Sequence, residues 1–285
     1  MRKKILRACI FVFLFIGLTN PSVFSGSVII FGDSQVDEAA QRQVARAVLT
    51  KKPSVIFRVG DLVDNGNSPA QWRLFNDINA GLLKTARYYP ALGNHENNSS
   101  LYFDNFPFLH NRKWYSVEYE GVHFIVLDSS SDLGRGSAQY AWLESDLRGI
   151  GQDIKFKIVL LHHPLFSVGG HEEDSRNLKA ALLPLLEKYG VSALFSGHDH
   201  NYQRLLFRGI YYIVTGGGGS ALRERTRTSP YLQVFKKVYH FCMLTKSDSV
   251  LSVRVFDSNL RMIDKFSISG GRKVRSRLQK TALSF

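Results

Sequence analysis

The chain has 285 residues, is 44% hydrophobic and carries a formal net charge of +13. This length and apolar content are sufficient for one domain with a sizeable core. They exclude a disordered chain, a collagen and a coiled coil. The basic excess suits an anionic substrate or partner, and the sequence contains no internal repeat.

Residues 1–25 have the pattern of an export signal. A basic start precedes an apolar run over 8–18, and Val23 and Ser25 occupy the minus-three and minus-one positions before a cleavage site. The apolar run is shorter than the ~20 residues that a membrane-spanning helix needs. We therefore expect cleavage before Gly26, rather than an uncleaved anchor, and a secreted or periplasmic protein. No later segment is expected to span a membrane.

Removal of this segment changes two properties of the chain. It leaves Cys242 as the only cysteine, which excludes an intramolecular disulfide. Cys242 lies in an expected strand over 238–244, where a buried structural thiol is expected rather than a nucleophile. Four basic residues are also lost, so the net charge falls from +13 to about +9.

The other end of the chain is a basic tail, 269–285. Within it, the stretch 270–280 holds five basic residues and no acidic one. Such a run can contact an anionic surface, but solvated tails are more common and we favour that interpretation. Residues 26–268 then form the main domain.

The signals for strands and helices alternate through the first two thirds of the chain, and strands dominate the rest. We expect strands over 27–31, 55–59, 88–92, 115–119, 122–127, 157–161, 191–195, 211–214, 238–244, 250–256 and 262–268. We expect helices over 37–49, 69–83, 138–147 and 176–189, with Ser68 capping the second. This order predicts an α/β (α+β) layered sandwich in which two mixed β-sheets are flanked by helices.

Polar side chains stand at the ends of five of these strands. In chain order the segments are Gly32-Asp33-Ser34-Gln35, Gly60-Asp61-Leu62-Val63-Asp64, Gly93-Asn94-His95-Glu96, His162-His163-Pro164 and Ser196-Gly197-His198-Asp199-His200. Because ligands bind at the carboxyl ends of strands in open α/β sheets, we expect these side chains to meet. The other histidines of the strands and turns, His110, His123 and His240, are expected to be ordinary hydrogen-bonded residues.

The chemistry of this set indicates metal ions. Carboxylate, amide and imidazole donors without thiolate suit Fe, Zn or Mn. The donors exceed the needs of one ion, which favours a two-metal site with a shared carboxylate.

With these motifs the chain resembles the calcineurin-like metallophosphoesterases from Asp33 to about Ser220. The segments 197–204 and 215–219 are most similar to the purple acid phosphatase branch. The resemblance implies a dimetal phosphohydrolase in which a metal-bound hydroxide attacks a phosphate ester. It assigns Asp33, Asp61 and His200 to the first metal, and Asp61, Asn94, His162 and His198 to the second. It also implies two catalytic residues: His95 at the leaving group and His171 facing the substrate.

The chain departs from the family pattern at the first metal. Gln35 stands where most of the family has a histidine, and Asp64 stands where purple acid phosphatases have a tyrosine. Gln35 is expected to complete the shell with its amide oxygen, with Asp64 as the alternative ligand.

The sequence thus predicts an exported, metal-dependent phosphatase that acts on small phosphomonoesters. A phosphodiesterase acting on nucleotides or glycerophosphodiesters is the first alternative. A non-catalytic phosphate-binding protein, suggested by Gln35, is the second. Charge alone does not indicate a nucleic-acid partner, because no recognition motif accompanies it. The natural substrate, the metal identities and the oligomeric state stay open at this stage.

Overall fold

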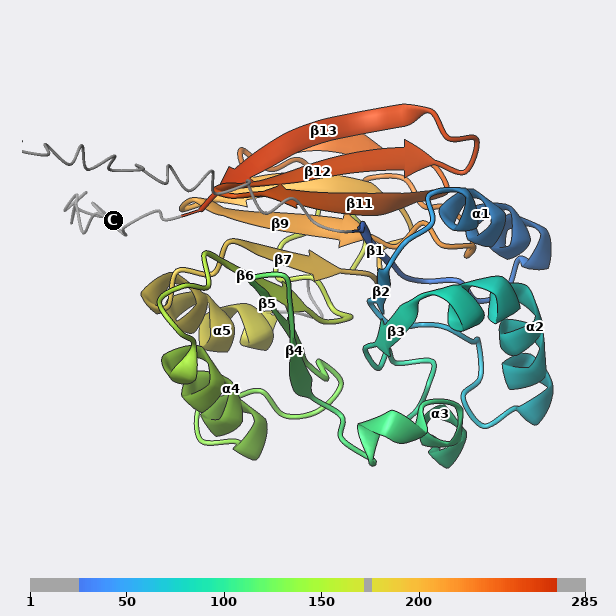
Figure 1. The fold of residues 1–285 in the computed structure, drawn as a ribbon, viewed down its shortest axis with the longest axis horizontal. Coiled ribbons are helices and arrows are strands. Elements are labelled where there is room, and N and C mark those ends of the chain that lie inside the picture. Colours follow the sequence, from blue (N-terminus) through green and yellow to red (C-terminus); the bar gives the residue numbers. More distant parts are fainter. Residues whose placement is uncertain (1–25, 172–175, 271–285) are drawn as a thin grey trace, which may run out of the picture.

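Two β-sheets stacked on each other, with helices outside them, make up the computed structural model (Figure 1). It describes residues 26–171 and 176–270. The expected signal segment, 1–25, and residues 271–285 of the basic tail lie outside the described residues.

The first sheet has six strands in the order β13-β12-β11-β1-β2-β3. The strands are β1 (Val28–Phe31), β2 (Val55–Arg58), β3 (Arg87–Pro90), β11 (His240–Ser247), β12 (Val250–Asp257) and β13 (Met262–Ser269). The strands β1, β2 and β3 run parallel, while β11 pairs with β1 antiparallel. Ile30 of β1 lies between Phe57 of β2 and Cys242 of β11.

The second sheet has seven strands in the order β10-β8-β9-β7-β6-β5-β4. Its strands are β4 (Tyr115–Tyr119), β5 (Val122–Val126), β6 (Phe156–Leu160), β7 (Ala193–Ser196), β8 (Tyr202–Phe207), β9 (Ile210–Thr215) and β10 (Leu232–Lys236). Its centre, β5-β6-β7-β9, is parallel, and the pairs at both edges are antiparallel. Both sheets are therefore mixed, and the predicted fold class is confirmed.

The helices lie in two groups (Figure 1). They are α1 (Glu38–Thr50), α2 (Pro69–Thr85), α3 (Ser100–Asn105), the 3₁₀ turn η1 (Pro107–Leu109), α4 (Ala138–Gly149) and α5 (Arg176–Lys188). Helices α1 and α2 lie together beside β1–β3, and α4 and α5 lie beside β4–β7. The predicted cap on α2 is confirmed, because the Ser68 hydroxyl accepts a hydrogen bond from the Gln71 backbone N–H.

The alternation of strand side chains divides the core into two layers. Phe124 and Val126 of β5 belong to the main cluster, which includes residues of both sheets, whereas Ile125 faces α4 and α5. Phe57 stacks on Phe124 across the sheets with ring centroids 4.5 Å apart. Strands buried on both faces read as continuous apolar runs, which is why their positions were predictable.

Strands β8 and β10 were not predicted. Gln203 of β8 is buried, but its amide binds Ser167 and Val168, so a polar residue occupies a core position. The edge strand β10 is partly exposed and carries no apolar run. Such strands depend on pairing with their neighbours more than on their own pattern.

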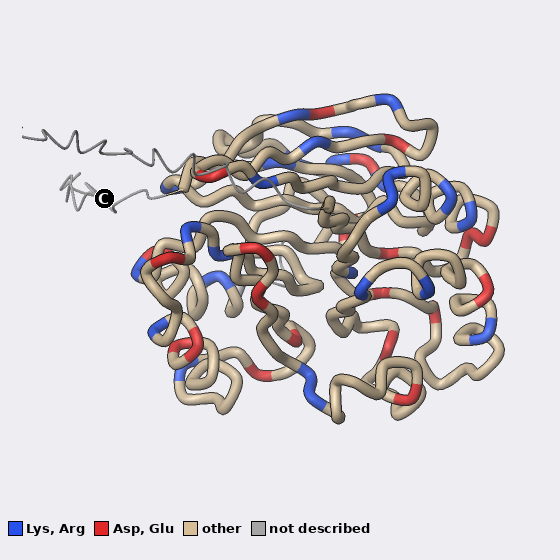
Figure 2. The backbone as a smooth tube through the Cα atoms, viewed as in Figure 1, with Lys and Arg blue, Asp and Glu red and all other residues tan. Residues whose placement is uncertain are grey.

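Basic and acidic residues are interspersed over the helices and over the strands of the first sheet (Figure 2). No helix in the described part of the chain combines the length and apolar character needed to cross a membrane. Cys242 is buried, as predicted. Burial raises the pKa of its thiol to about 12.

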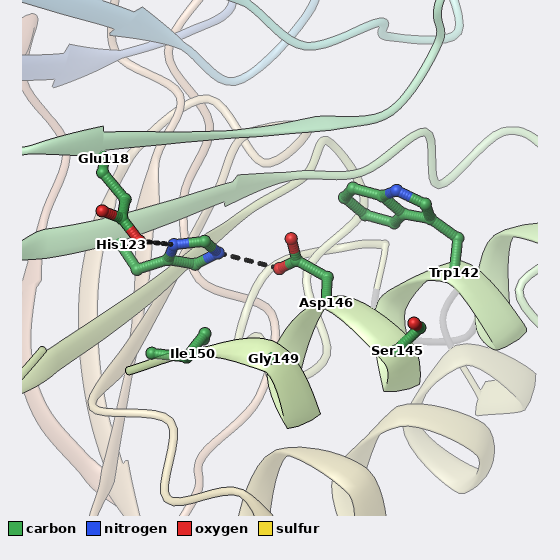
Figure 3. A pocket seen from close by; sticks show the side chains of 7 residues that line it. All are labelled: Glu118, His123, Trp142, Ser145, Asp146, Gly149 and Ile150. Atoms are coloured by element: carbon green, nitrogen blue, oxygen red, sulfur yellow. Dashed lines mark hydrogen bonds and ion pairs between the residues drawn. The ribbon is translucent and has the colours of Figure 1, made fainter. Parts of the chain in front are cut away.

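His123 of β5 links the β4–β5 hairpin to α4 through contacts with two carboxylates (Figure 3). Its Nε2 lies 2.8 Å from Asp146 Oδ2, and its Nδ1 lies 3.3 Å from Glu118 Oε1. The Ser116 hydroxyl also donates to Asp146, and Trp142 lines the same hollow of about 280 Å³. Burial lowers the pKa of His123, but the two carboxylates outweigh this effect and raise the pKa above its ordinary value of 6.5.

We predict that His123→Gln lowers the free energy of unfolding by about 1–2 kcal/mol at pH 6 and by much less at pH 9. A raised folded-state pKa gives stabilisation that is complete below pH 6.5 and is lost as the pH rises through the folded value. Denaturant unfolding at the two pH values measures the difference. His110→Gln, at an exposed position, is the control. Equal destabilisation by His123→Gln at both pH values would contradict a stabilising ion pair between a protonated His123 and the two carboxylates.

Candidate metal centre

The loops that follow five strands meet where the two sheets come together. Asp33 follows β1, Asp61 follows β2, Asn94 follows β3, His162 follows β6, and His198 and His200 follow β7. Backbone contacts fix the loops to one another. The Asp33 N–H donates to the Gly60 carbonyl at 3.0 Å, and the His198 N–H donates to Asp33 Oδ1 at 2.8 Å.

Asp61 and His162 form the middle of this cluster. Asp61 Oδ2 lies 3.2 Å from His162 Nε2. Asp33, Asp61 and His162 bring one donor atom each to within 4.8 Å of one another, and all three residues are buried. The three side chains can therefore hold one ion.

His162 also faces a second group of donors. Its Nε2 lies 2.9 Å from Asn94 Oδ1 and 3.1 Å from His198 Nδ1. Its Nδ1 donates to the Val59 carbonyl at 2.9 Å. That hydrogen bond fixes the tautomer, so the lone pair of Nε2 is aimed at the cluster.

His200 lies beside Asp33. Its Nε2 is 3.7 Å from Asp33 Oδ1, and its Nδ1 donates to the Ala221 carbonyl at 3.0 Å. Burial, with the nearby charge of Arg223, lowers the pKa of His200 to about 4. The imidazole is thus neutral at physiological pH, as a metal ligand must be.

His163, to which the family resemblance gives no ligand role, adds a further imidazole. His162, His163 and His198 also bring donor atoms to within 4.8 Å of one another. The His163 Nδ1 lies 2.9 Å from the Ser129 hydroxyl.

The electrostatics of the cluster favour cations. Burial, and then the neighbouring Asp61, raise the pKa of Asp33 to about 8. Burial lowers the pKa of His162, but the Asp61 and Asp33 carboxylates outweigh it and raise the pKa to about 10. Asp33 Oδ2 and Gln35 Oε1 are buried and have no hydrogen-bond partner in the described part of the chain. Buried oxygens without partners are costly, and bound metal ions would satisfy them.

Glycines leave the space that the carboxylates occupy. A Cβ on Gly93 would lie 2.1 Å from Asp61 Oδ1, and a Cβ on Gly197 would lie 2.2 Å from Asp33 Oδ2. A larger residue at either position would displace the acidic side chain. The glycines before Asn94 and His198 are therefore required by the site itself.

Glu96 is a positioning residue to which the sequence analysis gave no role. Its buried carboxylate accepts hydrogen bonds from the backbone N–H groups of Asp61, Leu62, Val63 and Gly93. Burial, and then the Asp61 charge, raise the pKa of Glu96 to about 7. The Gly-Asn-His-Glu motif contained the signal, because a carboxylate next to two loop ends can bind the N–H groups of both.

The two candidate ligands at the position where the chain departs from the family pattern, Gln35 and Asp64, lie in different places. The Gln35 amide is buried and donates from Nε2 to Asp61 Oδ2 at 3.3 Å. The Asp64 carboxylate instead lies 3.3 Å from His95 Nδ1. His95 Nδ1 also donates to the Asp64 carbonyl at 2.7 Å, and its ring is about one-third exposed.

His171 approaches the cluster from the loop after β6. Its ring centroid lies 4.3 Å from that of His198. Its Nε2 accepts a hydrogen bond from the Arg223 guanidinium. Arg223 was not predicted from the sequence, because it lies in a loop without any strand or helix signal.

A layered α/β fold with clustered carboxylates and imidazoles at its strand ends defines a metal-binding hydrolase-type site. The profile of the calcineurin-like phosphoesterases matches residues 26–202. The chain belongs to this family, as its motifs predicted.

Individual relatives point to one branch of the family. Purple acid phosphatase 18 of Arabidopsis thaliana is 29% identical over 213 residues, which cover 65% of this chain and 49% of that protein. Probable inactive purple acid phosphatase 27 of the same plant is 27% identical over 269 residues, covering 76% and 44%. The chain spans about half the length of these curated relatives.

The fold agrees with a solved structure. The purple acid phosphatase PPD1 of yellow lupin (Lupinus luteus) superposes with a TM-score of 0.76 at 23% identity, covering 88% of this chain and 54% of that one. The likeness to PPD1 concerns the fold. The predicted kind of cofactor, metal ions held by Asp and His, is confirmed by the family and by the two groups of donors.

Proposed function

We propose that this protein is a metal-dependent phosphoesterase with two metal ions that share Asp61. The observation that supports this proposal is that Asp61 and His162 belong to two overlapping sets of donors. Asp33, which contacts His200, lies close to Asp61 and His162, and His162 also contacts Asn94 and His198. A shared carboxylate between two donor sets is the arrangement that a dimetal hydrolase needs.

In this proposal each ion has its own ligands. The first ion is held by Asp33, Asp61 and His200, with the Gln35 amide oxygen as a further donor. The second is held by Asp61, Asn94, His162 and His198. Oxygen and nitrogen donors without thiolate suit Fe, Zn or Mn. When bound, such ions supply Lewis-acid chemistry, activating water and neutralising phosphoryl charge.

His95 has the geometry of a proton donor. Its Nδ1 is held by the carbonyl and carboxylate of Asp64. These contacts orient the ring, and its Nε2 lies 3.9 Å from Asp61 Oδ2. The partly exposed ring can then donate a proton from Nε2 to the departing oxygen of the ester.

Space for the organic part of a substrate lies beside Asn94. A hollow of about 230 Å³ is lined there by Asn97, Asn98, Asp128, Ser130 and Ser131, among others, without Lys or Arg. These amides and hydroxyls, with the Asp128 carboxylate, suit a hydrogen-bonding leaving group. A non-catalytic phosphate-binding protein is the alternative, suggested by Gln35 and by the names of three relatives, which are probable inactive purple acid phosphatases.

We expect Asp61→Asn and His198→Ala to abolish turnover and to lower the bound metal, because each removes a proposed ligand. His95→Ala should retain its metal and lose about 10²–10⁴-fold in rate. Elemental analysis joined to turnover of an aryl phosphomonoester measures both quantities. His110→Ala, at an exposed position, is the control. If His95→Ala lost as much metal as the other two variants, its role as a proton donor would be wrong.

Gln35→His should tighten the first metal site, because imidazole is a stronger donor than an amide toward borderline ions. An effect of roughly 10–100-fold is typical of changes close to a metal. Metal titration with chelator competition measures it. Asp64→Ala should leave the affinity unchanged, since its carboxylate lies against His95. An unchanged Gln35→His with a large loss in Asp64→Ala would transfer the ligand role to Asp64.

We also propose that residues 1–25 are a signal peptide, 26–268 the catalytic domain and 269–285 a basic tail. The basic and apolar pattern of 1–25 supports export. Intact-mass analysis of the full chain expressed in a secreting host should give a product that begins near Gly26. A retained Met1 in the membrane fraction would refute export.

A further inference from the structure

One loop is hydrogen-bonded to the segments that carry Asp33 and His200. We refer to residues 220–227 as the crossing loop. At its start, the Ser220 N–H donates to the Asp33 carbonyl at 3.0 Å, and the Ser220 hydroxyl donates to the Gln35 carbonyl at 3.1 Å. The loop therefore begins directly on the segment that carries the first proposed ligands.

The middle and the end of the crossing loop are held as firmly. The Arg223 N–H donates to the His200 carbonyl at 3.0 Å, and the Asn201 amide donates to the Arg223 carbonyl at 3.2 Å. The Thr226 N–H donates to the Val168 carbonyl at 2.8 Å. Both peptide groups of Arg223 are thus anchored to the segment of His200, which fixes the point from which its side chain extends.

The Arg223 side chain contacts His171. Its guanidinium donates to His171 Nε2, and the His171 ring packs against His198. The acid next in sequence, Glu224, is engaged by Lys237 at 3.0 Å. No carboxylate of the described residues forms an ion pair with Arg223.

The guanidinium of Arg223 is therefore available beside the proposed metal ligands for an anion. An anion at this point would accept hydrogen bonds from the guanidinium, whose planar fork matches the spacing of phosphate oxygens. A phosphomonoester dianion carries about twice the charge of a diester monoanion, so it gains more from an added cation.

We propose that Arg223, together with His171, binds an oxygen of the substrate phosphoryl group and thereby favours phosphomonoesters over phosphodiesters. The proposal rests on the phosphoesterase function proposed above. Arg223 is then a substrate-binding residue, and the anchored crossing loop holds it in place before the substrate arrives.

Binding of inorganic phosphate to the metal-loaded protein tests the first half of this proposal. Calorimetry should give a dissociation constant about 10–100-fold weaker in Arg223→Ala than in the unaltered protein, which is typical of losing hydrogen bonds to a charged group. Arg223→Lys should recover part of the loss, because it restores charge but not the planar fork. Arg225→Ala, on the exposed part of the same loop, should bind phosphate normally.

The ratio of kcat/KM values for a monoester and a diester tests the second half of the proposal, the preference for phosphomonoesters. Arg223→Ala should lower kcat/KM for an aryl phosphomonoester about ten times more than for the matching diester. The guanidinium that is removed attracts a dianion more strongly than a monoanion. A purely structural role would lower both values equally. Equal phosphate affinity in Arg223→Ala and the unaltered protein would overturn the proposal, as would an unchanged monoester-to-diester ratio.

The two proposals fail in different ways. Tight phosphate binding that depends on Arg223, without turnover of any ester, would refute the enzyme and leave Arg223 as a phosphate-binding residue. Turnover with phosphate affinity independent of Arg223 would refute only the role of Arg223. No phosphate binding by the metal-loaded protein would refute both.

Discussion

Two buried carboxylates at the junction of the sheets set the main electrostatic constraint on this molecule. Asp33 and Asp61 are almost fully removed from solvent, and His162 is the buried basic side chain against Asp61. Burial of like charges is unfavourable unless cations or hydrogen bonds compensate it. The surrounding loops are arranged around this requirement. Their hydrogen-bond donors and imidazole rings face the two acids, and their glycines leave room for the acidic side chains.

The compensation comes mainly from the backbone and from neutral side chains. Glu96 gathers the N–H groups of two loops and so holds Asp61 in place. The carbonyls of Val59 and Ala221 accept hydrogen bonds from Nδ1 of His162 and His200, so that the Nε2 of each ring faces an acid. These contacts leave Asp33 Oδ2 and Gln35 Oε1 without a hydrogen-bond partner in the described part of the chain, where bound metal ions would satisfy them.

The Arg223 guanidinium brings a positive charge beside this cluster, where it contacts His171. The crossing loop that carries Arg223 is hydrogen-bonded to the segments of Asp33 and His200. The proposed metal ligands and the proposed substrate-binding residue are thus parts of one network of backbone hydrogen bonds. A change in either part is expected to be felt by the other, since groups in one network do not act additively.

The sequence by itself determined all the strands except β8 and β10, the fold class and the polar segments at the strand ends, because apolar periodicity and Gly-Asp turns are local properties. Asp61, Asn94 and His162 could be named before any geometry was known. Only the tertiary structure decided what Glu96 binds, and only it brought Arg223 to His171, 52 residues away. Such contacts depend on how two sheets stack and on where their connecting loops cross, which no local pattern encodes.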